Sequence, residues 1–263
     1  MDSTLKDLVE VIKKRKVSKS DKSYTYSLLN KGLDKCTENY NELKKAADNN
    51  LYVVIKNAIS KNLVNKIKKK INKDFNYKKD VRISGRHQFG RKNLHRLDCG
   101  EYGTSRFSRY FFYFPWNDNK EITFLHSKLL NLKNKICGTN YDLILGSKKK
   151  TNYSLFQIIQ YPIGGGFMSK HRDPARKEKN DTGYVIMLYL STLGKDFKSG
   201  GGYIYNKKNQ KLFVEKHLKS GDILIYKSNT LHGVEGIDKN KKITLNKING
   251  RIVAAATINY FKK

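Results

Sequence analysis

The segment YPIGGGFMSKHRD, residues 161–173, carries the first pattern that points to a function. It ends in His171-x-Asp173, a histidine and a carboxylate two positions apart. Side chains alternate along an extended strand, so these two point to the same side and can bind one metal ion. A His-x-Asp tripeptide also arises by chance, and its interpretation therefore depends on residues later in the chain.

His232, in GDILIYKSNTLHGVEG, is the best candidate for a third ligand. It lies 59 residues after Asp173, which leaves room for several strands between glycine turns. Two histidines and one carboxylate on one face, with open positions opposite, are typical of non-haem Fe(II) sites that activate oxygen. The alternative is a set of ordinary histidines in a β-sandwich.

Arg251 follows Gly250 and precedes the apolar run IVAAATI, residues 252–258. A buried arginine at the start of a strand offers forked donors to a carboxylate. Three lysines compete for this role, but they lie in the polar insert 238–249 and not at the strand: Lys241, Lys242 and Lys247.

Five segments, in this order, resemble the Fe(II)/2-oxoglutarate-dependent oxygenases, and within them the prolyl-hydroxylase-like branch: YPIGGGFMSKHRD, VIMLYLST, SGGGYIYNKKN, GDILIYKSNTLHGVEGI and GRIVAAATINYF. The resemblance covers roughly residues 156–261. It implies a mainly β protein with a double-stranded β-helix (jelly-roll) core and helices packed outside. It also implies Fe(II) as cofactor and 2-oxoglutarate as co-substrate, with ascorbate as an auxiliary reductant.

The same resemblance assigns roles to individual residues. His171, Asp173 and His232 would be the metal ligands and the catalytic centre. Arg251 would bind the far carboxylate of 2-oxoglutarate, with Tyr189 and Tyr161 lining its pocket, although either tyrosine is also compatible with a core position.

The region 81–119 combines arginines and histidines with the aromatic run FFYFPW. In the resembling family, segments before the core supply a wall of the substrate pocket. This makes Arg86, His87, Arg106 and Arg109 candidates for substrate contacts. The alternative is a buried aromatic strand whose arginine neighbours are solvated.

The chain divides into an N-terminal extension, residues 1–50, and an oxygenase domain, residues 51–263, with its core at 153–263. Apolar residues at helical spacing, including Tyr26, Leu29, Leu33 and Cys36, predict helices in the extension. LYVVIKNA, residues 51–58, predicts a strand, and Ser60 is placed to cap a helix over 61–75.

The formal net charge is +31, from 54 Lys and Arg against 23 Asp and Glu. Two explanations stay open: a polyanionic partner such as nucleic acid, or a biased composition rich in Lys, Asn and Ile. Three widely spaced cysteines argue against a disulfide framework. Without an apolar leader or a membrane-length apolar stretch, we expect a soluble intracellular protein, cytoplasmic or nuclear, of unspecified oligomeric state.

Three functions compete on this basis. The first is hydroxylation of an unactivated C–H bond on a protein side chain of prolyl type or on a free amino acid, with release of succinate and CO2. The second is an oxygenase or demethylase acting on nucleic acid, suggested by the charge and the arginine–aromatic segment. The third is a non-catalytic jelly-roll binding module, against which the complete ligand set argues.

Overall fold

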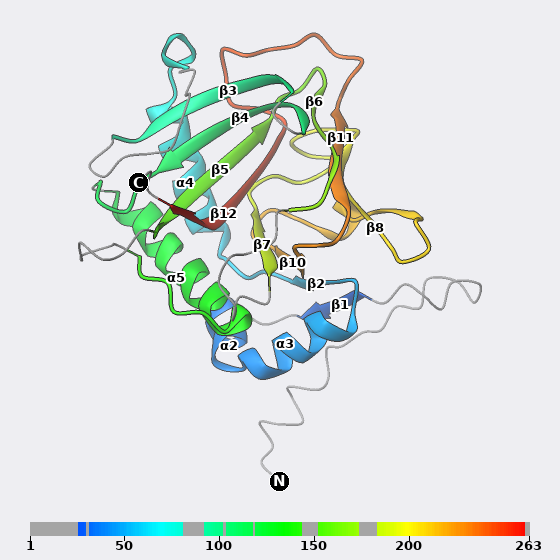
Figure 1. Ribbon diagram of the computed structural model, residues 1–263. Helices are drawn as coiled ribbons and strands as arrows, with labels where there is room; N and C mark the ends of the chain where they lie inside the picture. Colours follow the sequence, from blue (N-terminus) through cyan, green and yellow to red (C-terminus); the bar gives the residue numbers. More distant parts are fainter. Residues whose placement is uncertain are drawn as a thin grey trace.

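Twelve strands of the described residues form one continuous, curled sheet in the computed structural model (Figure 1). The structure describes residues 26–29, 32–80, 92–101, 104–117, 119–143, 152–173 and 183–260. The strands are β1 (Tyr26–Leu29), β2 (Tyr52–Ile55), β3 (Leu94–Glu101), β4 (Ser105–Tyr113), β5 (Asn152–Tyr161), β6 (Gly166–His171), β7 (Tyr184–Tyr189), β8 (Gly201–Tyr205), β9 (Lys211–Phe213), β10 (Ile223–Lys227), β11 (His232–Ile237) and β12 (Arg251–Tyr260). The helices are α2 (Leu33–Glu38), α3 (Tyr40–Asn49), α4 (Lys61–Asp74) and α5 (Lys120–Cys137), with 3-10 turns η1 (Tyr77–Lys79) and η2 (Glu215–His217).

The strand order is β1-β2-β10-β7-β12-β5-β4-β6-β11-β8-β9, and β3 pairs with β4. β4 joins two halves, because it pairs with β5 on one side and with β6 on the other. One half contains β10, β7, β12 and β5, and the other contains β6, β11, β8 and β9. Two facing antiparallel sheets of this kind form the double-stranded β-helix, so the expected fold is confirmed.

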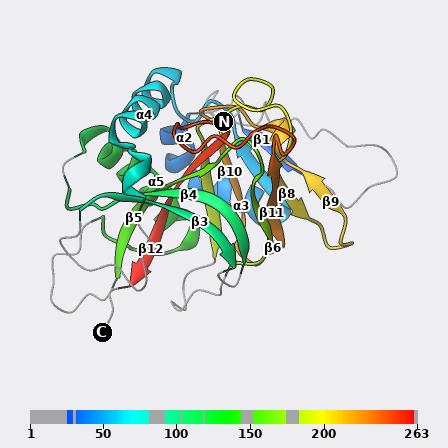
Figure 2. The same ribbon diagram turned by 90° about the horizontal axis from the view of Figure 1, so that it is seen from above.

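The curled sheet separates two hydrophobic cores. Ile252 and Ala254 of β12 belong to the outer core, between the sheet and the helices, whereas Val253 belongs to the core inside the barrel. This division follows from the alternation of side chains along a strand. Figures 1 and 2 show α4 and α5 on the side of β5 and β12, and β6, β11 and β8 on the opposite side.

The predicted helix after residue 60 is present. The Ser60 hydroxyl accepts a hydrogen bond from the Leu63 N–H at the first turn of α4. Val64, Ile67 and Ile71 bury one face of this helix, while its other face is rich in exposed lysine. α5 ends at Gly138, whose left-handed backbone (φ 65°) terminates the helix.

The prediction of helix over Tyr26–Leu29 is wrong. These residues form β1, which pairs in parallel with β2, and the helix begins only at Leu33. β2 pairs with β10 along one edge. β1 pairs with the opposite edge of β2 and so satisfies the backbone hydrogen-bonding groups there. Helices α2 and α3 are present as expected, and they contribute Leu33 and Leu43 to the outer core. The rest of the predicted extension, residues 1–25, lies outside the described residues.

The polar insert 238–249 crosses the end of the barrel between β11 and β12 (Figure 1, orange). Ile243 of the insert lies against Gly164, where an added Cβ would come within 2.7 Å of the Ile243 Cα. Asp238 accepts hydrogen bonds from the N–H groups of Lys198 and Ser199. No helix within the described residues is long and apolar enough to cross a membrane.

Candidate functional site

The metal-ligand candidates meet at one end of two neighbouring strands. His171 ends β6, His232 begins β11, and the two are register partners with ring centroids 4.3 Å apart. Asp173 follows β6, and its N–H donates to the Ser228 carbonyl, which turns the carboxylate toward the histidines. Ligand atoms of His171, Asp173 and His232 all lie within 4.8 Å of one another. A single metal ion can therefore reach all three.

Backbone carbonyls determine which ring nitrogen of each histidine faces the cavity. Nδ1 of His171 lies 2.9 Å from the Ser169 carbonyl, and Nδ1 of His232 lies 2.8 Å from the Thr230 carbonyl. A carbonyl can only accept, so Nδ1 carries the proton in the neutral ring, and Nε2 is then the nitrogen whose lone pair can bind a metal. Burial lowers the pKa of His232, which favours the neutral imidazole that a metal requires.

Tyr226 borders the same centre, a position that the sequence did not single out. Its ring packs edge-on against the His232 ring at 5.0 Å. Burial, and next the nearby Asp173 carboxylate, raise the pKa of Tyr226 well above its ordinary value. The side chain is therefore a neutral phenol at the cavity wall.

Arg251, the first residue of β12, is fully buried behind the metal-ligand cluster. Its Nε donates to Glu215 Oε2 at 2.9 Å and its Nη2 donates to the Tyr189 hydroxyl at 2.7 Å. Its guanidinium also lies over the rings of Tyr161 (5.2 Å) and Tyr189 (5.0 Å). Nη1 is buried and has no hydrogen-bond partner among the described residues. A buried donor without a hydrogen-bond partner costs free energy, so we expect an acceptor to pair with Nη1.

Glu215 fixes the orientation of this arginine. The carboxylate is almost wholly buried, and its Oε2 also accepts from the Gly202 N–H at 2.7 Å. A Cβ at Gly202 would lie 3.1 Å from Arg251 Nη2 and 3.3 Å from the Tyr189 hydroxyl, so a side chain there would crowd the group. Gly250 has φ +81°, and a Cβ there would come within 2.3 Å of the Tyr161 carbonyl oxygen. Only glycine fits at this position.

A cavity of about 470 Å³ connects the two parts of the site. Its lining includes His171, Asp173, His232, Arg251, Tyr189 and Tyr161. Burial raises the pKa of both tyrosines, so they remain neutral hydrogen-bonding groups. The structure thus brings together all six residues that were assigned to the metal and the co-substrate.

The substrate candidates do not share one location. Arg106 lines the cavity, where its Nη1 donates to the Tyr110 hydroxyl at 3.3 Å and its Nε to the Thr104 carbonyl at 3.2 Å. Arg86 and His87 lie outside the described residues. Arg109 is completely buried and is not among the residues that line this cavity.

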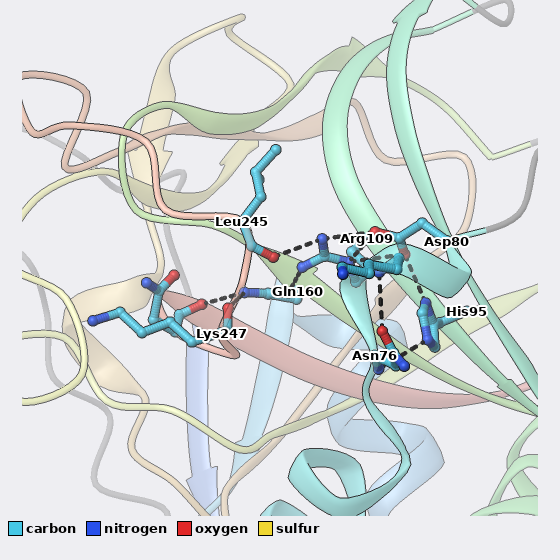
Figure 3. Close-up of polar contacts among 9 residues, drawn as sticks. Asn76, Asp80, His95, Arg109, Gln160, Leu245 and Lys247 are labelled. Atoms are coloured by element: carbon cyan, nitrogen blue, oxygen red, sulfur yellow. Dashed lines mark hydrogen bonds and ion pairs between the residues drawn. The ribbon is translucent and has the colours of Figure 1, made fainter.

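Arg109 instead belongs to a polar cluster with Asp80, Gln160 and the Leu245 carbonyl (Figure 3). Its Nη2 donates to Asp80 Oδ2 at 2.8 Å and to the Leu245 carbonyl at 3.0 Å, and its Nη1 donates to Gln160 Oε1 at 2.9 Å. Gln160 in turn donates to the Asn249 carbonyl at 2.9 Å. The cluster therefore holds the insert 238–249 where it leads into Arg251.

The insert lysines that competed with Arg251 stay outside the cavity. Lys241 pairs with Asp238 at 3.0 Å, and neither Lys242 nor Lys247 lines the cavity wall. Two other histidines of the chain are structural. His126 is hydrogen-bonded to the Ser154 hydroxyl in the core, and His217 packs beside Tyr52.

Residues 156–248 match the model of the 2OG-Fe(II) oxygenase superfamily. The matched residues include His171, Asp173 and His232. The match supports a 2-oxoglutarate-dependent dioxygenase, with Fe(II) as cofactor and 2-oxoglutarate as co-substrate. A search of curated proteins finds no match.

Two solved structures share the fold of this oxygenase at low sequence identity. The prolyl-4-hydroxylase of Pseudomonas putida is 10% identical with a TM-score of 0.51, over 84% of this chain and 98% of that one. A full-length protein of Neurospora crassa, in complex with alpha-KG, is 9% identical with a TM-score of 0.53, over 91% of this chain and 87% of that one.

The side chains of this oxygenase fit both groups. In the neutral rings, the two Nε2 atoms and a carboxylate form a donor set suited to Fe(II). The unpartnered Nη1 of Arg251 suits a carboxylate oxygen. Sequence reasoning did not find Glu215, because one acidic residue in FVEKHLKS carries no motif that distinguishes it from a surface residue.

Proposed function

We propose that this oxygenase hydroxylates an unactivated C–H bond on a protein side chain of prolyl type or on a free amino acid, releasing succinate and CO2. The observation that carries the proposal is the placement of the His171–Asp173–His232 cluster and the unpartnered Arg251 Nη1 in one cavity. When bound, Fe(II) and 2-oxoglutarate activate O2, with one oxygen atom leaving in succinate and the other in the hydroxylated product.

His171, Asp173 and His232 would hold Fe(II) on one side and leave its remaining positions facing the cavity. The carbonyls of Ser169 and Thr230 keep the two rings in the tautomer that binds metal. Such pre-orientation lowers the cost of ordering the ligands when the metal binds.

Arg251 would bind the far carboxylate of 2-oxoglutarate through Nη1, with the Tyr189 hydroxyl beside it. Tyr189 accepts from Arg251 Nη2, which leaves its own proton available to the same carboxylate. Both groups are buried, and a charge-assisted hydrogen bond is stronger where water is excluded. Tyr161 covers the guanidinium and excludes water from this end.

The substrate would enter beside the metal ligands, where Arg106 and Tyr110 form part of the cavity wall. A guanidinium suits a peptide carbonyl or the carboxylate of an amino acid. The fold shared with a prolyl-4-hydroxylase supports the preference for a protein or amino-acid substrate.

The test is succinate formation from 2-oxoglutarate with Fe(II), ascorbate and O2, in the presence of separate pools of peptides, free amino acids and oligonucleotides. We expect iron-dependent succinate that rises with the peptide or amino-acid pool. Stimulation by oligonucleotides alone would replace this substrate class with nucleic acid. An Arg106→Gln variant is expected to lose stimulation by the substrate while keeping its 2-oxoglutarate affinity.

A further inference from the structure

Three adjoining, lysine-rich segments make up what is here called the cationic face: residues 61–80, 192–199 and 238–249. Lys68 of α4 pairs with Asp196 at 2.9 Å, which ties the first segment to the second. Asp238 accepts from the Ser199 N–H at 2.7 Å, which ties the second to the third. Arg109 bonds both Asp80 and the Leu245 carbonyl, which ties the third to the first (Figure 3).

The cationic face lies away from the metal-ligand cluster. The insert 238–249 follows Ile237, at the opposite end of β11 from His232. In Figures 1 and 2 the orange insert crosses this end of the barrel beside α4. A partner bound here would leave the cavity beside His171 and His232 accessible.

The lysines of the cationic face outnumber its carboxylates. Its three segments contain fourteen lysines and four aspartates, with no arginine or glutamate. All four aspartates are engaged: Asp74 with Lys70 and Tyr113, Asp80 with Arg109 and His95, Asp196 with Lys68, and Asp238 with Ser199 and Lys241. Ten further lysines are exposed, and no carboxylate of the described residues pairs with them: Lys61, Lys66, Lys69, Lys73, Lys78, Lys79, Lys195, Lys239, Lys242 and Lys247.

The chemistry of the face favours nucleic acid over a lipid surface. An amphipathic helix binds membranes by burying its apolar face in the lipid, but α4 already buries Val64, Ile67 and Ile71 in the protein core. Its outward side presents Lys66, Lys69 and Lys73, one helical turn apart, as point charges. Tyr77, which is 49% exposed, lies between this row and Lys78 and offers an aromatic surface to a base.

We infer that the cationic face is a docking surface for the phosphate backbone of a nucleic acid, separate from the catalytic cavity. Lysine contacts to phosphates release counterions, so the affinity should fall steeply as salt rises. The contacts carry no sequence information, and binding should be similar for different sequences.

The test is fluorescence anisotropy with labelled single-stranded DNA, duplex DNA and RNA, between about 50 and 200 mM salt. The variant Lys66→Gln/Lys69→Gln/Lys73→Gln removes the row on α4 while keeping good helix-forming residues. The charge-matched control is Lys45→Gln/Lys207→Gln/Lys208→Gln, at exposed lysines of α3 and of the β8–β9 connection. These measurements need neither iron nor turnover, so they are independent of the proposed function.

We expect the α4 variant to weaken binding equally for all sequences and to lower the slope of log affinity against log salt by about 3, roughly one unit per lysine. The control variant should retain the wild-type slope. Equal weakening in both variants would mean that net charge alone attracts the probe and would overturn the proposal. Absence of binding at low salt, or binding only to phosphatidylserine vesicles, would overturn it as well.

Discussion

Arg251 and Glu215 form an ion pair in which both side chains are almost completely buried, with Nε 2.9 Å from Oε2. This pair leaves one guanidinium nitrogen, Nη1, without an acceptor among the described residues. Glu215 therefore acts as a positioning residue, because it fixes the rotamer of Arg251 and directs the remaining donor to the cavity.

Glu215→Gln should destabilise the protein without 2-oxoglutarate and tighten the binding of 2-oxoglutarate. The amide can still accept from Arg251, but the guanidinium charge is no longer balanced, which costs about 3 kcal/mol for a buried pair. 2-Oxoglutarate, a dianion, then supplies the negative charge that balances the Arg251 guanidinium. Thermal unfolding with and without 2-oxoglutarate checks this, since the shift produced by the ligand should exceed that of the wild type. An equal or smaller shift would show that the negative charge of Glu215 does not oppose the ligand.

Arg251→Gln should weaken 2-oxoglutarate binding by about tenfold to a hundredfold, because charged hydrogen bonds contribute roughly 1.5–3 kcal/mol. The double variant Arg251→Gln/Glu215→Gln is the matched control, since it removes both charges. We expect it to recover stability relative to the single variant and to remain equally poor at binding 2-oxoglutarate. Calorimetric titration under anaerobic conditions measures both affinities. If the double variant regained affinity for 2-oxoglutarate, Arg251 would contribute to the stability of the fold and not to binding of this ligand.

Asp80→Asn should lower the free energy of unfolding at neutral pH. It should also make that free energy depend less on pH in the acid range. Burial raises the pKa of Asp80, but the hydrogen bonds and charges of His95 and Arg109 outweigh it and hold the pKa below its ordinary value. A carboxyl with a lowered folded-state pKa contributes stability above its unfolded pKa of about 4, and this contribution is lost as the pH falls through the folded value.

The free energies of unfolding of the wild type and of Asp80→Asn, measured with urea across the acid range, should begin to converge below about pH 4 and meet once the pH falls below the folded-state pKa of Asp80. The difference at neutral pH should be about 3 kcal/mol, because Arg109 loses its buried partner. A difference that stays constant at all pH values would show that the charge of Asp80 does not stabilise the fold.

The core of the fold could be predicted because its functional residues lie at strand ends. The pairing of β6 with β11 brings His171 and His232 together as register partners. Both residues stand in sequence motifs, so their proximity could be predicted. The β1 segment could not be predicted, because its helical spacing was overridden by pairing with the free edge of β2. The spacing of apolar residues within a segment does not show which strand, distant in sequence, has an unpaired edge.

The buried charges were the other features that the sequence did not reveal. Arg109 appeared as a substrate candidate among neighbouring arginines, yet Asp80 and Gln160 hold it in the interior. Glu215 lies among lysines and carries no motif, although it orients Arg251. In both cases the deciding partner is distant in sequence, and only the folded chain brings the charges together.

The proposed chemistry depends on His171, Asp173 and His232 holding Fe(II) beside an independent 2-oxoglutarate site at Arg251. Anaerobic equilibrium dialysis of Fe(II) and of 2-oxoglutarate with the wild type, Asp173→Ala and Arg251→Gln separates the two sites. We predict one Fe(II) per wild-type chain, loss of that binding in folded Asp173→Ala, and retained Fe(II) with weakened 2-oxoglutarate in Arg251→Gln. Wild-type Fe(II) affinity in Asp173→Ala would contradict this assignment of the metal ligands.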